Sequence, residues 1–263
     1  MNKINYQMDL NPKDVKISII TACYNSERTI KQTYESIACQ SHSNWEWLVT
    51  DDCSTDSTLN VLNDLSARDN RLKIFSSPAN LGAGAARNVS IENSAGRFLA
   101  FIDSDDMWAP TKLTKQLEFM LLGAISFSFT AFSVVDINGK EMGSKIDLSC
   151  PPSINYFELL AKKATFGCST VMIDTHYVGG VSMSTLRTGQ DYVTWLSILK
   201  CGVTAYSLKE PLTSYRIMSG SLSRNKFKKA LRQWDIYRSV EGLSLMNSFC
   251  YFCSYAWRAI FRN

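Results

Sequence analysis

Histidine, an apolar leader segment and a disulfide framework are all missing from this sequence. Only two histidines, His42 and His176, occur in 263 residues, and their surroundings indicate ordinary surface or loop roles, so a histidine-based metal centre is not expected. Residues 1–7 contain no apolar run of the kind that marks a secretory signal. The eight cysteines are scattered, and most follow or precede apolar residues, as free buried thiols do. We therefore expect a reduced protein on the cytosolic side of a membrane.

Extreme composition is absent as well. With 45% hydrophobic and 20% charged residues, no internal repeat and no low-complexity linker, the chain has the composition of an ordinary globular protein. The net charge of +4 hides an asymmetry, since residues 216–263 contain nine basic and two acidic residues and residues 1–215 contain 19 and 22. The net charge of −3 over residues 1–215 argues against a nucleic-acid-binding protein. The tail of charge +7 needs a separate explanation.

Apolar segments alternate with helical ones in the first part of the chain. Strands are predicted at 17–20, 45–49, 72–75 and 98–102, and helices at 25–39, from 56 onward and within 82–94. Four such units in succession predict an α/β fold with a parallel, doubly wound sheet. Ligands of such sheets bind at the carboxyl ends of the strands.

The second half is less regular. The pattern predicts a strand within 125–135, a tight turn at 138–139 with a return strand, a helix at 154–162, a strand at 169–173, a helix at 190–199, short strands at 203–208 and 212–215, and a basic amphipathic helix from about 226.

Two groups of carboxylates follow the second and fourth predicted strands. Residues 51–56 read DDCSTD and residues 103–106 read DSDD, so both groups lie at the same edge of the sheet. Neighbouring carboxylates repel one another unless a cation or hydrogen-bond donors compensate, and an Asp-x-Asp pair suits a divalent ion that also binds phosphate oxygens. Strand-end aspartates also form turns and helix caps. That simpler role is favoured for Asp56, whereas metal or ligand binding is favoured for Asp103, Asp105 and Asp52.

The glycine-containing segment 81–88 does not match a dinucleotide-binding fingerprint. Arg87 stands where the third glycine would be, and the segment follows the third strand instead of the first. A nicotinamide-dependent enzyme is therefore not expected. Small residues and a guanidinium at a helix start suit a diphosphate, although a simple helix start remains an equal alternative.

Four segments together resemble a known family. Residues 19–25 (IITACYN), 49–56 (VTDDCSTD), 80–88 (NLGAGAARN) and 101–108 (FIDSDDMW) are similar, in order and spacing, to the motifs of family 2 glycosyltransferases. The resemblance is dense over 16–120. It implies a GT-A fold, which is Rossmann-like with a mostly parallel central sheet flanked by helices, and transfer with inversion of the anomeric centre. Ala22 replaces a common proline and Cys53 a common glycine, and neither change removes a charged or hydrogen-bonding group.

The same resemblance implies the roles of individual residues. The nucleotide-sugar site would comprise Thr21, Tyr24, Asn25, Asp52, Arg87, Asp103 and Ser104. Within it, Asp52 would accept from the uracil ring, Arg87 would lie near the base or diphosphate, and Asp103 would face the ribose. Asp105 would hold Mn²⁺ or Mg²⁺, which offsets the charge that develops on the leaving nucleoside diphosphate.

An inverting transfer also needs a base opposite the leaving group. The family places Glu-Asp before an aromatic-rich helix, and residues 189–196 (GQDYVTWL) fit with Gln190 in the Glu position. Asp191 is therefore predicted to be the catalytic base, with an N-cap role as the alternative. In the related polar loop after residue 212, many members carry a histidine near Met218, and its absence leaves Arg216 or Lys226 for the donor phosphates.

Residues 242–257 contain no charged residue but many aromatic ones. The segment is short for a membrane span, and basic residues flank it, as in a helix that lies in the lipid interface. A helix packed on the core is the alternative. A polyprenyl-diphosphate acceptor, which bacterial relatives of this layout often extend, would explain both lipid affinity and basic charge.

The sequence thus predicts a GT-A catalytic domain at 1–215 with a nucleotide-sugar-binding half (16–108) and an acceptor-binding half (109–215). A basic amphipathic, helical C-terminal extension follows at 216–263. The expected activity is transfer of a hexose from a UDP-sugar to a lipid-linked saccharide in O-antigen or capsule assembly. The enzyme would be cytoplasmic and peripheral on the inner face of the cell membrane, and would not bind nucleic acid.

Two other functions fit part of the pattern. A metal-dependent nucleotidyltransferase would need a glycine-rich loop after the first strand, and residues 22–28 contain no glycine. A nucleotide-sugar or saccharide-binding module that has lost catalysis is suggested only by Gln190.

Overall fold

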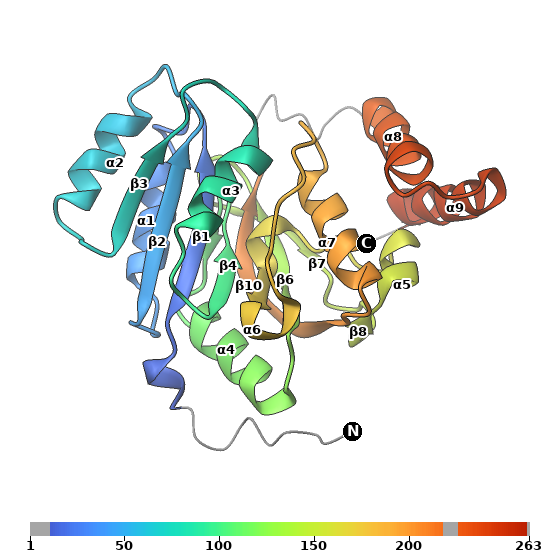
Figure 1. Ribbon diagram of the computed structural model, residues 1–263, viewed down its shortest axis with the longest axis horizontal. Helices are drawn as coiled ribbons and strands as arrows, with labels where there is room; N and C mark the ends of the chain where they lie inside the picture. Colours follow the sequence, from blue (N-terminus) through green and yellow to red (C-terminus); the bar gives the residue numbers. More distant parts are fainter. Residues whose placement is uncertain (1–10, 218–225, 262–263) are drawn as a thin grey trace.

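A computed structural model describes residues 11–217 and 226–261. One mixed sheet forms its centre, with the strand order β3-β2-β1-β4-β9-β6-β10-β5, and β7 and β8 pair with β6 and β10. The first half of the chain contributes β1 (Ile17–Cys23), α1 (Ile30–Ala38), β2 (Trp45–Asp51), α2 (Thr58–Ser66), β3 (Leu72–Ser76), α3 (Ala83–Glu92) and β4 (Phe98–Phe101). These four strands are parallel, as predicted, and Figure 1 shows helices on both faces of the sheet.

The second half contributes β5 (Met107–Trp108), α4 (Lys112–Gly123), β6 (Phe127–Val135), β7 (Glu141–Ile146), β8 (Ser153–Ile154), α5 (Tyr156–Leu160), β9 (Val171–Asp174), α6 (Thr175–Val178), α7 (Gln190–Lys200) and β10 (Ala205–Arg216). Beyond the second gap lie α8 (Lys226–Asp235), a π-helical turn (Ile236–Val240) and α9 (Leu245–Phe261). Strand β9 runs antiparallel to both β4 and β6. The sheet remains mostly parallel, in agreement with the predicted fold class.

Two hydrophobic cores cover the two faces of the sheet. Ile19 of β1 lies in the core under α1, α2 and α4, whereas its neighbour Ile20 lies in the core under α3, α5 and α7. Successive strand residues point to opposite faces, so a strand covered on both sides is apolar throughout. This arrangement explains why β1 could be located from a short segment that is mostly apolar, with Ser18 and Thr21 as its buried polar residues.

The sequence misplaced the start of the first helix. Helix α1 begins at Ile30, not at residue 25, because Asn25 adopts a left-handed backbone conformation (φ 50°). Its side-chain oxygen accepts from the backbone N–H of Thr55 (2.9 Å) instead of capping the helix.

The two short strands predicted at 203–208 and 212–215 form one strand. Strand β10 is continuous along β6, with register shifts on either side of Pro211. Proline lacks the N–H that a ladder needs and is tolerated at such irregularities. Strand β5 and helix α4 were not predicted. Helix α4 does carry a usable signal, because Leu113, Leu117 and Met120 are buried at helical spacing.

None of the eight cysteines forms a disulfide, as expected, but the expectation that most are buried is wrong. Only Cys23, Cys150 and Cys168 are buried, while the other five are exposed because they occupy loops, helix ends and the outer face of α9.

The C-terminal helices pack on the domain with one face only. Tyr237, which follows α8, is fully buried and donates to the carbonyl of Leu160 (2.5 Å), and Tyr251 and Phe252 of α9 pack on the same core. One face of α9 is therefore packed on the core, as in the second alternative for 242–257, while the opposite face is exposed. Within the described residues, no helix is long and apolar enough to cross a bilayer. Figure 1 places α8 and α9 at the opposite end of the molecule from α2.

Candidate active site

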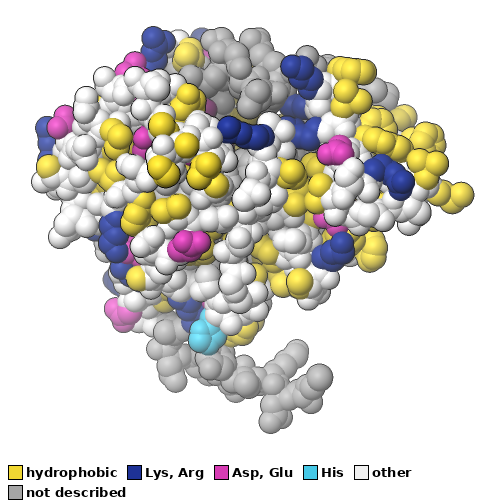
Figure 2. Space-filling model, turned by 45° about the horizontal axis from the view of Figure 1, so that its top comes forward, with side chains coloured by type: hydrophobic (Ala, Val, Ile, Leu, Met, Phe, Trp, Pro, Cys, Tyr) yellow, Lys and Arg dark blue, Asp and Glu magenta, His cyan; other side chains and the backbone are white. Residues whose placement is uncertain are grey.

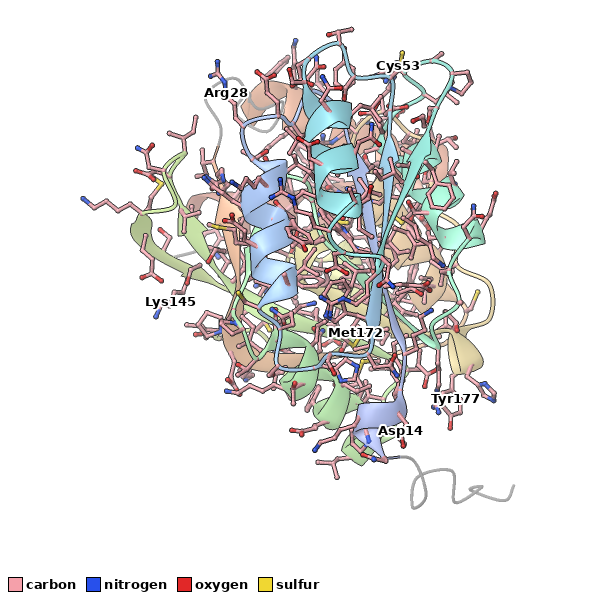
Figure 3. The ribbon with its side chains drawn as sticks, turned by 90° about the vertical axis from the view of Figure 1, so that its left-hand side faces the viewer. Asp14, Arg28, Cys53, Lys145, Met172 and Tyr177 are labelled. Atoms are coloured by element: carbon pink, nitrogen blue, oxygen red, sulfur yellow. The ribbon has the colours of Figure 1, made fainter. Side chains whose placement is uncertain are left out.

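The candidate site lies where β1, β2 and β4 end. Figure 3 shows Cys53 beyond β2 at one end of the molecule and Asp14, just before β1, at the other. Thr21 lies beneath this edge with its side chain fully buried. Its hydroxyl donates to the carbonyl of Ile102 (2.9 Å) and accepts from Nε1 of Trp47 (2.8 Å). Thr21 therefore ties the three strands together below the site surface.

Tyr24 and Asn25 form the rim of the site after β1. The Tyr24 side chain is 49% exposed, so its ring is open to a planar ligand. The backbone N–H of Asn25 donates to Oγ of Ser54 (2.9 Å). This bond, together with the contact of Asn25 to Thr55, joins the loop after β1 to the acidic loop after β2.

Asp52 holds the segment before α3 against the end of β2. Its two carboxylate oxygens accept from the backbone N–H groups of Leu81 (2.9 Å) and Gly82 (2.8 Å). Gly82 has φ 96°, a conformation that side chains rarely adopt. Asp52 is itself buried, and thus sets the position at which α3 begins.

Arg87 of α3 is the cation at the centre of the site. It is only 4% exposed, and its Nη2 forms a salt bridge with Asp103 (2.5 Å). Its Nε and Nη1 atoms are buried without an acceptor among the described residues. Burial opposes the charged form, but the negative charges of Asp103 and Asp191 help to keep the pKa of Arg87 above its usual value. Arg87 is thus paired directly with the acidic residues that follow β4.

Asp103, Asp105 and Asp106 form an acidic cluster after β4. Their carboxylate oxygens lie within 4.8 Å of one another. Burial and the charge of Asp103 raise the pKa of Asp105 to about 6, and burial and the charge of Asp105 raise the pKa of Asp106. A divalent cation would relieve this repulsion.

The three carboxylates differ in what already binds them. Asp106 accepts from Oγ of Ser169 (2.5 Å) and from the backbone N–H of Arg216 (2.9 Å). Asp103 is paired with Arg87, whereas no other residue in the described ranges donates to the Asp105 carboxylate. Asp105 is therefore the most available ligand of the cluster. Ser104, between them, lies with its Oγ 2.8 Å from Oγ of Ser26.

Ser169 was not identified from the sequence. Its Oγ accepts from the backbone N–H of Asp103 (2.9 Å) and donates to Asp106. It lies in a short 3₁₀ turn (Cys168–Thr170) before β9. No local pattern distinguishes this serine, because its role depends on β9 pairing beside β4.

Asp191 lies in the first turn of α7, half-buried. The helix begins at Gln190, and Gly189 is its N-cap in a left-handed conformation (φ 80°). The alternative that Asp191 is the N-cap is therefore wrong. No hydrogen bond from another described residue reaches its carboxylate.

Close packing fixes α7 against α3. A Cβ on Gly84 would lie 2.0 Å from the carbonyl oxygen of Ser184, so only glycine fits. The side chain of Asn88 donates to the carbonyl of Met183 (3.0 Å) and accepts from its N–H (2.7 Å). These contacts bring the segment that carries Asp191 to the helix that carries Arg87.

Of the two candidates for the donor phosphates, Arg216 is already engaged. It is buried, its Nε donates to the carbonyl of Asp105 (2.7 Å) and its Nη2 to Oε1 of Gln32 (2.6 Å). The Lys226 side chain and the loop 218–225 lie outside the described residues.

Comparison with known proteins gives concordant matches. A family model described as glycosyl transferase family 2 matches residues 18–177. Glycosyltransferase TuaG of Bacillus subtilis, named for teichuronic acid biosynthesis, is 42% identical over 93% of this chain and 96% of its own. The Escherichia coli UDP-Glc:alpha-D-GlcNAc-diphosphoundecaprenol beta-1,3-glucosyltransferase WfaP is 36% identical over 85% of this chain and 86% of its own.

A solved structure agrees with the fold. Staphylococcus aureus TarS 1-349 in complex with UDP-GlcNAc superposes with a TM-score of 0.72 at 20% identity, and the match covers 95% of this chain and 74% of that one.

Proposed function

The chain belongs to glycosyl transferase family 2, and on that premise we propose that it is an inverting, metal-dependent hexosyltransferase of cell-surface polysaccharide assembly. The donor would be a UDP-sugar and the acceptor a saccharide on a polyprenyl diphosphate. The observation that carries this proposal is the packing of the segment that bears Asp191 against α3, the helix whose buried Arg87 is paired with Asp103. It brings a candidate metal-binding cluster and a candidate base to the same site.

The donor nucleoside would bind at the rim formed by the loops after β1 and β2. The exposed ring of Tyr24 offers a stacking surface for the base. A carboxylate has about four acceptor positions, so Asp52 retains lone pairs for the uracil N–H beyond those that Leu81 and Gly82 use. Asn25 and Ser104 would complete the ribose side, and Arg87 has two N–H directions left for the donor diphosphate.

The acidic cluster fits a hard divalent cation. Its donors are all carboxylate oxygens within 4.8 Å, which suits Mg²⁺ or Mn²⁺. Asp105 would be the principal ligand, with Asp103 beside it. Asp106 would help to position Asp103, because Ser169 donates to Asp106 and accepts from the backbone N–H of Asp103. When bound, the cation would stabilise negative charge on the leaving diphosphate.

Asp191 would act as the base. Its carboxylate takes the proton of the acceptor hydroxyl while that oxygen attacks the anomeric carbon, and the bond to the UDP oxygen breaks on the opposite side. An α-linked donor therefore gives a β-linked product. A positioned base contributes about 10²–10⁴ in rate.

The exposed apolar face of α9 is the basis for proposing that the acceptor is bound to a membrane. Its solvent-facing stripe comprises Met246, Phe249, Cys250, Cys253 and Trp257, with Met246 77% and Trp257 65% exposed. Figure 2 shows hydrophobic side chains gathered at this end of the molecule, with Lys and Arg beside them. We propose that α9 lies on the anionic inner surface of the cell membrane. The enzyme would work there on a lipid-linked saccharide, the class of acceptor that WfaP is named for.

A donor screen with a synthetic GlcNAc-diphosphate-lipid acceptor tests the proposal. We expect UDP release and a β-linked disaccharide, identified by mass and by NMR coupling constants. Asp191→Asn should lower kcat by a factor of about 10²–10⁴ without changing the melting temperature, and the exposed Asp64→Asn should match the wild type.

Three outcomes would count against it. Wild-type turnover in Asp191→Asn would remove the assigned base. Pyrophosphate release from UTP and a sugar phosphate would indicate a nucleotidyltransferase. Donor binding with neither transfer nor slow donor hydrolysis would indicate a binding module.

A further inference from the structure

A small basic pocket lies between the C-terminal helices and the turn after α5. Its volume is about 270 Å³, and its walls include Lys162, Thr165, Lys229, Arg232, Tyr255 and Arg258. Sites that enclose a drug-sized ligand occupy about 300–1,000 Å³. The pocket is therefore suited to a phosphoryl group and its immediate substituents, and too small for a whole nucleotide sugar.

The charge of the pocket is unbalanced. Four of the side chains that line it are cationic and none is a carboxylate. Within the described residues, no salt bridge joins Lys229, Arg232 or Arg258 to an acidic group. Burial and the charge of Arg232 lower the pKa of Lys229, as expected when like charges are held together. An anion in the pocket would remove this repulsion, and the two guanidinium groups can each bind phosphate oxygens in a bidentate way.

The pocket adjoins the first turn of α7. A Cβ on Gly189 would lie 3.5 Å from Nε of Arg232, and Nζ of Lys162 lies 3.1 Å from the ring centroid of Tyr192. Gly189 and Tyr192 flank Asp191 along the chain. An anion held by Arg232 and Lys162 would therefore lie beside the first turn of α7, which carries the candidate base.

The pocket also adjoins the exposed apolar stripe of α9. Tyr255 and Arg258 line the pocket, and Cys253 and Trp257 of the same helix belong to the exposed stripe. One helix thus presents cationic and apolar surfaces next to each other. This combination matches a phosphate group that is esterified to a lipid.

We propose that this pocket binds the diphosphate of the lipid-linked acceptor. The sugar attached to that diphosphate then reaches Asp191, and the lipid chain leaves along α9. The inference rests on the proposed function, which requires a lipid-linked acceptor, and adds the site that recognises its phosphates.

Kinetics with two acceptors test the proposal in the full-length protein. One acceptor is GlcNAc-diphosphate-lipid, and the other is the same sugar and alkyl chain without phosphate. Arg232→Ala and Arg258→Ala should each raise KM for the diphosphate acceptor about tenfold. They should leave KM for the UDP-sugar and for the phosphate-free acceptor unchanged. The matched control is Lys228→Ala, which removes the same charge from an exposed position on α8 outside the pocket and should behave as the wild type. Equal changes for both acceptors would overturn the proposal.

Direct binding of geranyl diphosphate, measured by calorimetry without donor, separates this proposal from the proposed reaction. Weaker binding in both arginine variants, with no sugar transfer by the wild type, would support diphosphate binding in the pocket and refute the proposed glycosyl transfer. Unchanged binding of geranyl diphosphate in both variants, with sugar transfer intact, would refute the assignment of the pocket to the acceptor diphosphate. Arg232→Lys retains charge and should show a smaller loss, which guards against misfolding of the alanine variant.

Vesicles distinguish the acceptor diphosphate from a lipid head group. Loss of binding to phosphatidylglycerol vesicles, with unchanged affinity for geranyl diphosphate, would assign the pocket to membrane phosphates and overturn its role in acceptor recognition. Retained vesicle binding together with lost geranyl diphosphate affinity would support it.

Discussion

Replacing Asp105 with asparagine should stabilise the metal-free protein and abolish transfer. Burial and the neighbouring charge of Asp103 raise the pKa of Asp105 from 3.8 to about 6. One pKa unit corresponds to about 1.4 kcal/mol, so ionising this group in the folded state costs at most about 3 kcal/mol above pH 6. Asparagine keeps the shape of the side chain and removes the charge, and with it this cost.

The raised pKa of Asp105 determines how its contribution to the free energy of unfolding changes with pH. A group whose pKa is higher in the folded state favours folding below pH 3.8, and this contribution disappears as the pH rises through about 6. The gain in the free energy of unfolding of Asp105→Asn should therefore be present at pH 7.5 and absent at pH 4.

Urea unfolding in the presence of a chelator measures this gain at the two pH values. Mn²⁺ should stabilise the wild type but not Asp105→Asn, because the variant lacks the principal ligand. The exposed Asp64→Asn serves as the control and should change neither stability nor the response to Mn²⁺. An Asp105→Asn protein that is less stable than the wild type at pH 7.5 without metal would refute the reasoning.

Two further predictions concern stability and membrane binding. Buried Glu46 accepts from Nζ of Lys16 (2.9 Å) and Lys73 (2.8 Å), and although burial opposes ionisation, its hydrogen bonds lower its pKa to about 2. Glu46→Gln should therefore lose about 2 kcal/mol at pH 7, after allowance for the half-exposed lysines, and the difference should vanish toward pH 2; equal urea midpoints at pH 7 would contradict this. Serine at Met246, Phe249 and Trp257 together should weaken sedimentation with phosphatidylglycerol vesicles at least about tenfold. The exposed Leu122→Ser on α4 is the control, and undiminished binding of the triple variant would exclude α9 as the membrane contact.

The parts of the site that the sequence predicted depend on local pattern. Strands β1, β2 and β4 are mostly apolar because both faces are covered, and the two aspartate groups stand at the ends of β2 and β4. Their arrangement at one sheet edge then follows from the parallel topology alone. Asp191 was located because the motif that contains it is local too, and the helix predicted at 190–199 does begin at Gln190, with Gly189 instead of Asp191 as its N-cap.

The parts that were missed depend on contacts between distant residues. The packing of α3 against the segment near Met183 depends on the bonds of Asn88, and the bond from Ser169 to Asp106 requires β9 to lie beside β4. No local sequence pattern predicts either contact, because each joins residues that are far apart in the chain. The same holds for Arg216, which the sequence offers as a ligand of the donor phosphates but whose Nε donates to the carbonyl of Asp105 in the acidic cluster.

The antiparallel strand β9 has a consequence for recombining this protein with its relatives. Although it comes from the second half of the chain, β9 pairs on one side with β4 of the first half and on the other with β6. A chimera that joins two parents near residue 108 would therefore place a foreign strand at the centre of the sheet, next to β4. Exchanging acceptor specificity by swapping halves thus requires the β4–β9 pair to be inherited from one parent, and exchanging α8 and α9 requires the core around Tyr237 to be inherited with them.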